Sequence, residues 1–147
     1  METPLQQLRR LVNQVEKFLD KAAIDCGVEH LAGPQGFIVK LLYKNPEQIY
    51  SIKDVEDSLK ISKSVASNLV KRMEKNGFIQ VQPSQKDKRV KYLALTDLGR
   101  EKAVQFEKFV VYIHETMLAD ISREETEVAR GVMKKLSQNI QLDDIES

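Results

Sequence analysis

The segment from Ser62 to Gly99 constrains the fold of this chain more than any other. Serine suits the cap of a helix running over about 63–75, and Asn76-Gly77 is typical of the turn that ends a helix. Two runs rich in Val, Ile, Tyr and Leu, at 78–82 and 89–95, then flank a polar loop and predict a β-hairpin. A helix followed by a hairpin in this order is the arrangement of a winged helix-turn-helix, in which the helix enters a DNA groove and the hairpin reaches the neighbouring backbone.

The helix over 63–75 separates into two faces. Val65, Leu69 and Met73 recur at four-residue steps and are expected to be buried. The other face is polar and rich in hydroxyl groups, and no acidic residue stands between Ser62 and Met73. It carries the candidate DNA-contacting residues of the helix: Lys63, Ser64, Ser67, Asn68 and Lys71.

Positive charge is concentrated in the same part of the chain. Nine basic and two acidic residues lie between Lys60 and Lys91, so this segment carries +7. Because the whole chain carries +1, the remainder sums to −6. The hairpin loop contributes the candidate residues Lys86, Asp87, Lys88 and Arg89. A basic stripe on an otherwise acidic protein is the electrostatic pattern of a nucleic-acid site.

Helical patterns dominate the rest of the chain. Apolar residues at three- and four-residue steps predict long helices near both ends, over about 4–26, over 96–119 and after Ser122. These helices have more apolar surface than a small winged domain covers, which favours pairing with a second copy. We therefore predict a mostly α fold with a small β-hairpin wing, in which a winged domain at 31–99 is flanked by a helical dimerisation region at 1–30 and 100–147.

Composition excludes several classes of protein. No apolar run approaches the ~20 residues of a membrane span, and the N-terminus lacks the pattern of a secretion signal. A single cysteine, Cys26, cannot form an intramolecular disulfide, which fits a cytoplasmic protein. No Gly-rich phosphate loop or catalytic triad pattern stands out, so neither an enzyme nor a cofactor is predicted.

The chain resembles the MarR family of winged helix-turn-helix transcription regulators over about 52–102. The resemblance is carried by Ser64-Val65-Ala66-Ser67-Asn68-Leu69-Val70-Lys71-Arg72-Met73-Glu74-Lys75-Asn76-Gly77-Phe78-Ile79, by Asp87-Lys88-Arg89 and by Leu95-Thr96-Asp97-Leu98-Gly99. It implies an obligate homodimer that binds a near-palindromic operator in double-stranded DNA, and a wing arginine, Arg89, that enters the minor groove and is positioned by Asp87. One departure is that the family often carries arginines where this chain has Gln80-Val81-Gln82.

On this reading each recognition side chain has a definite chemistry. The Asn68 amide suits a bidentate contact with adenine, and Lys71 suits guanine or phosphate. Ser64 and Ser67 lie near the helix N-terminus, where hydroxyl and backbone N–H groups meet phosphates or base edges. We expect a sequence-specific repressor with half-sites ~34–36 Å apart, released by a small ligand that changes this spacing.

Two alternatives remain open. Cys26, His30 and His114 could make the protein a metal- or thiol-sensing regulator, with Cys26 as a redox switch. However, Gly27 interrupts the helix that would place Cys26 and His30 one turn apart. Alternatively, the winged domain could serve as a protein-interaction module that no longer binds DNA. The residues argue more strongly for DNA binding than for either, and no metal site is predicted.

Overall fold

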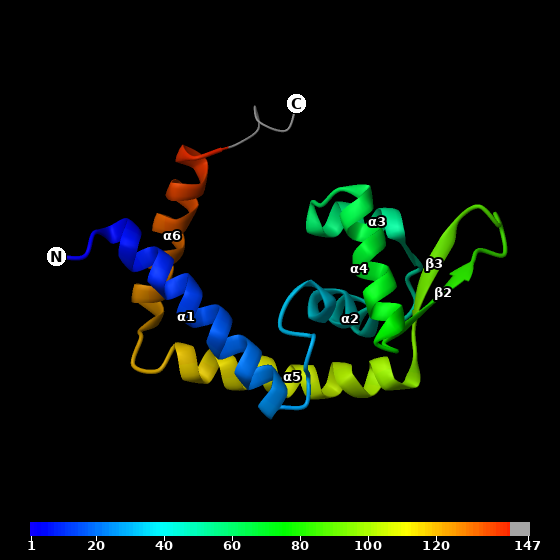
Figure 1. Cartoon of the computed structure of the whole chain (residues 1–147), viewed down its shortest axis with the longest axis horizontal. Coiled ribbons are helices and arrows are strands. Elements are labelled where there is room, and N and C mark those ends of the chain that lie inside the picture. The colour runs from blue at the N-terminus through cyan, green and yellow to red at the C-terminus, as the bar shows by residue number, and fades with distance from the viewer. Residues whose placement is uncertain (142–147) are drawn as a thin grey trace. The chain divides into compact units, whose positions relative to one another are not determined.

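The computed structural model describes residues 1–141 of the chain. The elements occur in the order α1 (Pro4–Asp25), α2 (Pro34–Lys44), β1 (Tyr50–Ser51), α3 (Ile52–Leu59), α4 (Lys63–Lys75), β2 (Ile79–Pro83), β3 (Lys91–Leu95), α5 (Asp97–Met117) and α6 (Arg123–Asn139) (Figure 1). The chain divides into two compact units, residues 1–113 and the part from 114 onward, and α5 runs from the first into the second. The predicted mostly helical fold with a hairpin wing is confirmed. Of the predicted dimerisation region, 142–147 lies outside the described residues.

Helices begin where the sequence supplies caps. Ser51 and Asp54 form a reciprocal capping box at the start of α3: the Asp54 N–H donates to Ser51 Oγ at 3.2 Å, and the Ser51 N–H donates to the Asp54 carboxylate at 2.8 Å. Ser62 Oγ accepts the Val65 N–H at 3.2 Å and starts α4. Lys60, with φ of 54°, takes the left-handed conformation that ends α3 and turns the chain into α4.

The sheet has three antiparallel strands in the order β1-β3-β2, one more than the predicted hairpin. Strand β1 is only two residues long, Tyr50–Ser51, and pairs with Leu93 and Tyr92. The loop of the wing also differs: it covers 84–90 instead of 83–88. The Ser84 N–H donates to the Val90 carbonyl at 2.8 Å. This bond closes the loop at Val90, whereas the apolar pattern predicted that the loop ends at residue 88.

The core of the first unit lies between α2, α4 and the sheet. The largest side chains that are almost fully buried are Leu31, Ile38, Leu69, Met73 and Ile79. One apolar residue expected inside is instead exposed, Val65 at 49%. In α4 the buried positions are Ala66, Leu69, Val70 and Met73, which places Val65 at the flank of that stripe.

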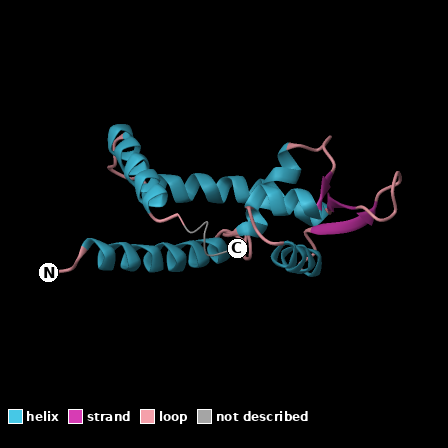
Figure 2. Cartoon of the chain, turned by 90° about the horizontal axis from the view of Figure 1, so that it is seen from above, coloured by secondary structure: helices cyan, strands magenta, loops and turns pink. Residues whose placement is uncertain are grey.

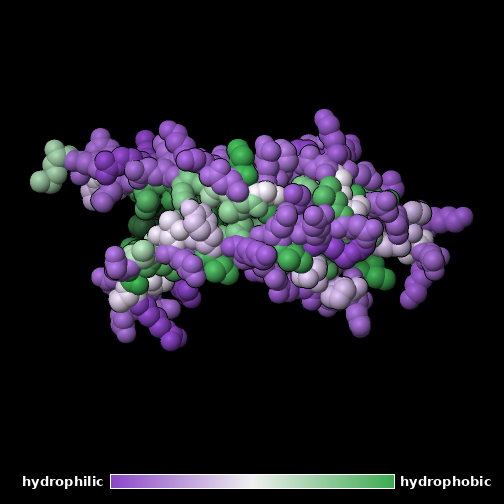
Figure 3. Space-filling model, turned by 90° about the horizontal axis from the view of Figure 1, so that it is seen from below, coloured by the Kyte–Doolittle hydropathy of each residue, from purple (hydrophilic) through white to green (hydrophobic). Residues whose placement is uncertain are grey.

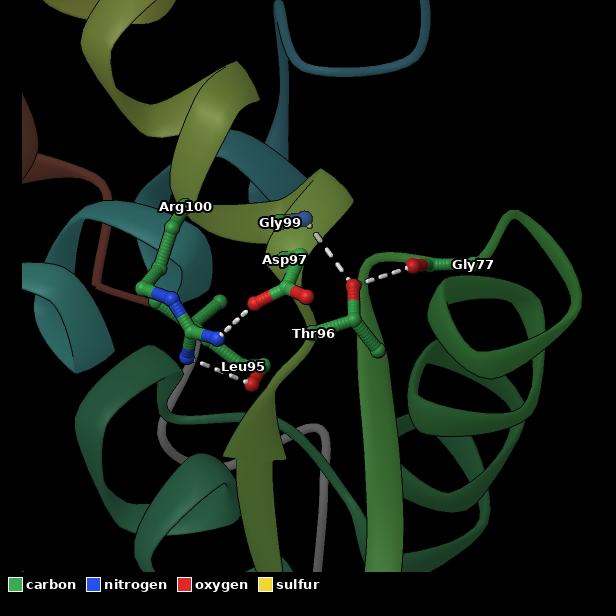
Figure 4. Close-up of polar contacts among 6 residues, drawn as sticks. All are labelled: Gly77, Leu95, Thr96, Asp97, Gly99 and Arg100. Atoms are coloured by element: carbon green, nitrogen blue, oxygen red, sulfur yellow. Dashed lines mark hydrogen bonds and ion pairs between the residues drawn. The ribbon is translucent and has the colours of Figure 1, made fainter.

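Thr96 ties the end of α4 to the start of α5 (Figure 4). Its hydroxyl donates to the Gly77 carbonyl at 2.5 Å and accepts the Gly99 N–H at 2.9 Å, so it caps α5 as predicted. Gly99 lies so close to β2 that a Cβ added there would stand 2.1 Å from the Phe78 carbonyl oxygen. Only glycine fits this contact, which holds α5 against the base of the wing.

An ion pair joins α2 to α5 within the first unit. Lys44 Nζ lies 2.5 Å from a Glu107 carboxylate oxygen. This hydrogen bond, together with the charge of Glu107, raises the pKa of Lys44 above its ordinary value. None of the described helices is long and apolar enough to cross a membrane.

In the second unit, α6 is capped by a reciprocal bond between Ser122 and Glu125, as the sequence predicts. Its apolar residues Val128, Val132 and Leu136 recur at four-residue steps and are all exposed. An apolar stripe of this kind is typical of a helix that packs against a partner.

Candidate nucleic-acid interface

The polar face of α4 is open to solvent. Lys63, Ser64, Asn68 and Lys71 are exposed, and Ser67 is half-buried. The opposite face supplies Ala66, Leu69, Val70 and Met73, each no more than 3% exposed. Because that stripe anchors the helix along its length, the polar face is presented by a rigid element. Four of the five predicted helix residues are thus fully available to a ligand.

The loop between β2 and β3 is organised around Asp87. One carboxylate oxygen of Asp87 accepts the backbone N–H of Arg89 at 3.0 Å and its side-chain Nε at 3.3 Å. The Arg89 side chain is nonetheless 92% exposed. Figure 2 shows the loop projecting beyond the strands, and in Figure 3 hydrophilic side chains cover this end of the molecule. The arrangement orients a guanidinium group while leaving its remaining donors free.

A groove brings helix and wing together. It measures about 460 Å³ and lies between α3, α4 and the loop end of the wing. Its lining residues are Ser51, Ile52, Lys53, Glu56, Lys63, Ser67, Arg89, Val90 and Lys91. Four of these are cationic and one is acidic, so the groove suits a phosphate backbone. It unites Lys63, Ser67 and Arg89 of the predicted set, whereas Ser64, Asn68, Lys71, Lys86, Asp87 and Lys88 lie outside it.

Lys53 was not singled out from the sequence. It stands in the first turn of α3, before the basic segment begins, and only the fold places it beside Lys63 and Arg89. The sequence feature that could have pointed to Lys53 is the capping box at Ser51. It fixes where α3 begins and hence which way the first turn of α3 faces.

The strand positions that lack the family's arginines are occupied by a small polar network. Tyr92 Oη donates to the Gln82 side-chain oxygen at 2.7 Å, and the Gln82 amide donates to Gln80 at 3.3 Å. Gln82 thus links β2 to β3, while Gln80 bonds to Gln82 within β2. At the loop end of the wing, cationic groups come instead from Lys91 and from Lys53 on α3.

The three candidate sensing residues are dispersed along the chain. Cys26 is half-buried at the C-terminus of α1, and His30 is exposed in the turn that follows, with φ of 76°. His114 is exposed in the last turn of α5. Within residues 1–141, no group of three or more His, Cys, Asp or Glu side chains is placed to hold a metal ion.

A two-faced helix beside a basic three-stranded wing defines a winged helix-turn-helix protein. Comparison with known proteins agrees: residues 31–90 match the model of the MarR family. The curated Bacillus subtilis protein YwhA, an HTH-type transcriptional regulator, is 25% identical over 122 residues, which cover 83% of this chain and 84% of that protein. The chain belongs to the MarR family of DNA-binding transcription regulators, and it is not an enzyme.

Solved structures add a more similar relative. The heme sensor protein PefR from Streptococcus agalactiae, solved in complex with heme, is 58% identical, with all of both chains covered and a TM-score of 0.85. A DNA complex of MepR from S. aureus shares the fold at 19% identity, with a TM-score of 0.74 over 95% of this chain and 97% of that one.

Proposed function

We propose that the protein is a homodimeric, sequence-specific transcriptional repressor whose DNA binding responds to heme. The observation that carries this proposal is the 58% identity to a heme sensor over the whole chain. The surface formed by α4 and the wing supports the DNA-binding part of it. Since chromosomal DNA is its target, we expect the protein to act in the cytoplasm.

Readout of a DNA site would be divided between two elements. The exposed face of α4 enters the major groove, where Asn68 can bond adenine and Lys71 can bond guanine or phosphate. Arg89, oriented by Asp87, reaches the neighbouring minor groove or backbone, and Lys86 and Lys88 add charge beside it. The groove lined by Lys53, Lys63 and Lys91 would follow the phosphates between them.

Exposed apolar surface supports a homodimer. On α1, Leu5, Leu8, Leu11 and Val12 are exposed, and Val128, Val132 and Leu136 on α6 are exposed together with Ile140 directly after it. Apolar stripes of this extent on both terminal helices are costly to leave in water, and a second copy is the simplest partner that covers them. Two copies would present two recognition helices to half-sites ~34–36 Å apart. Bound across a promoter, such a dimer represses by excluding RNA polymerase.

The chain has residues that could hold heme. Heme iron in proteins takes axial ligands such as His or Cys, and this chain has Cys26, His30 and His114. His30 lines a small cavity of about 300 Å³ together with the acidic residues Asp20 and Glu29, which disfavours the heme propionates.

His114 fits better. Its side chain is exposed, and Met117, Leu118 and Ile121 nearby in the chain are exposed and apolar, so an imidazole and an apolar surface are both available. We infer that His114 would hold the heme iron. When bound, heme supplies an iron centre that can take a further ligand. A heme effect on transcription requires that heme bind the DNA-competent and DNA-incompetent states with different affinities.

The proposal is tested by fluorescence anisotropy titration of the purified protein against its own upstream promoter duplex and a scrambled duplex, at two salt concentrations. We expect tight binding to the promoter that falls steeply with salt and weakens when hemin is added. Protoporphyrin IX without iron serves as the control and should have little effect. Sequence-preferring binding that ignores hemin would reject the heme response alone, whereas no binding at low salt would reject the whole proposal.

A further inference from the structure

Val65 is the unexplained residue of the recognition helix. The apolar pattern predicts it as part of the core, yet it is 49% exposed, while Ala66, Leu69, Val70 and Met73 fill the buried stripe at no more than 3% exposure. A half-exposed valine at the flank of the buried stripe leaves part of its side chain in solvent. Its apolar surface is therefore available to a ligand of α4.

The position of Val65 is well defined. It is the third residue of α4, and its backbone N–H donates to the capping hydroxyl of Ser62 at 3.2 Å. In helix-turn-helix proteins the N-terminal residues of the second helix are those that contact base edges. Asn68, one turn later on the adjoining part of the same face, is also exposed. Val65 therefore flanks the helix face that carries the predicted adenine contact.

A β-branched side chain at this place has a definite partner in DNA. The only apolar group on the major-groove edges of the bases is the 5-methyl group of thymine. Valine in a helix holds one strongly preferred rotamer, so its methyl groups can contact a base without much loss of side-chain freedom. The helix face that Val65 flanks carries Ser64, Asn68 and Lys71, which are polar or cationic, and this favours DNA over an apolar protein partner.

We propose that Val65 contacts the 5-methyl group of one thymine in each half-site and so helps to determine operator sequence. This assignment rests on the proposed sequence-specific DNA binding. Such a contact lets α4 distinguish thymine from deoxyuridine, because deoxyuridine differs from thymidine only in this methyl group. Hydrogen-bonding side chains cannot make this distinction.

The experiment is a double-mutant cycle between Val65 and single thymines. A high-affinity duplex is first selected from a random library with the full-length protein. Each thymine of the selected half-site is then replaced by deoxyuridine, symmetrically in both half-sites, and affinity is measured for the native protein, Val65→Ala and Val104→Ala. Val104 is a similarly exposed valine on α5 and serves as the matched control.

We expect one thymine position at which deoxyuridine weakens native binding by about fourfold per half-site, as for the loss of one buried methyl group. Val65→Ala should bind thymine and deoxyuridine duplexes equally at that position, whereas Val104→Ala should keep the native ratio. Because Val65 is exposed, Val65→Ala is expected to melt at the native temperature.

Equal thymine-to-deoxyuridine ratios for the native protein and Val65→Ala at every position would overturn the Val65 contact while leaving sequence-specific binding intact. Failure of the library to yield any preferred sequence would overturn both the contact and the sequence specificity on which it rests.

Discussion

Asp87 holds Arg89 by two bonds to one carboxylate oxygen, from the backbone N–H at 3.0 Å and from Nε at 3.3 Å. The arginine side chain remains 92% exposed, and exposed ion pairs of this kind contribute only about 0–1 kcal/mol to stability. The contact therefore does little for folding. Its effect is to orient one cationic group at the outer end of the wing, where a DNA ligand would meet it.

Arg89→Ala is expected to weaken operator binding by about 1–3 kcal/mol without changing the melting temperature, because the side chain is 92% exposed and its ion pair is within its own loop. Asp87→Ala should weaken binding less, since the arginine is kept but no longer oriented. Anisotropy titration and thermal melting measure the two effects. Arg130→Ala on α6 is the control and should bind the operator with native affinity. If Arg89→Ala also bound with native affinity, Arg89 would not be part of the DNA interface.

Asn68→Ala is expected to cost about 1–3 kcal/mol in operator affinity and to relax specificity at a single base pair, because it removes a bidentate contact. The measurement compares affinities for duplexes in which each operator position carries each base in turn. Asn13→Ala, an exposed asparagine on α1, provides the comparison. Uniform weakening across all sequences would indicate that Asn68 contacts only the backbone.

Lys53→Ala and Lys91→Ala test the phosphate role of the groove. Each should reduce the slope of log affinity against log salt by about 0.9 per protomer, the value for one lost phosphate contact, while leaving base preferences unchanged. Titrations at four or more salt concentrations give the slope. Lys17→Ala on α1 removes the same charge outside the groove, so a matching change in its slope would mean that only net charge matters.

Gly99→Ala is expected to destabilise the fold by about 1–3 kcal/mol, because the added methyl group would stand 2.1 Å from the Phe78 carbonyl oxygen. Gly131→Ala is the matched control. Nothing lies within 4 Å of a Cβ at that helical position, so alanine there should stabilise by up to about 1 kcal/mol. Urea denaturation measures both; a neutral Gly99→Ala would show that α5 can shift away from β2.

His114→Ala is expected to abolish the absorption band of the hemin complex and the effect of hemin on operator affinity, since it removes the residue proposed to hold the heme iron. Operator binding without hemin should be unchanged. His30→Ala and Cys26→Ser are compared by the same spectra and are expected to keep the native band. If His30→Ala or Cys26→Ser lost the band while His114→Ala kept it, the residue replaced in that variant would be the heme ligand instead of His114.

Local chemistry explains what could be predicted of the fold. The caps at Ser51, Ser62 and Ser122 act within three residues, so they are visible as short motifs in the sequence. Strand β1 could not be found in this way. A strand of two residues has no periodicity of its own, and only its pairing with β3 creates it.

The sequence by itself determined the class of protein, through a capped two-faced helix, a basic hairpin and their order along the chain. Tertiary structure decided which groups meet. It brought Lys53 beside Lys63 and Arg89, and it left Val65 exposed where spacing alone predicted burial. The physical reason is that a helical pattern marks an apolar stripe only to within about one residue, whereas the neighbours packed against the helix select the side chains that are covered.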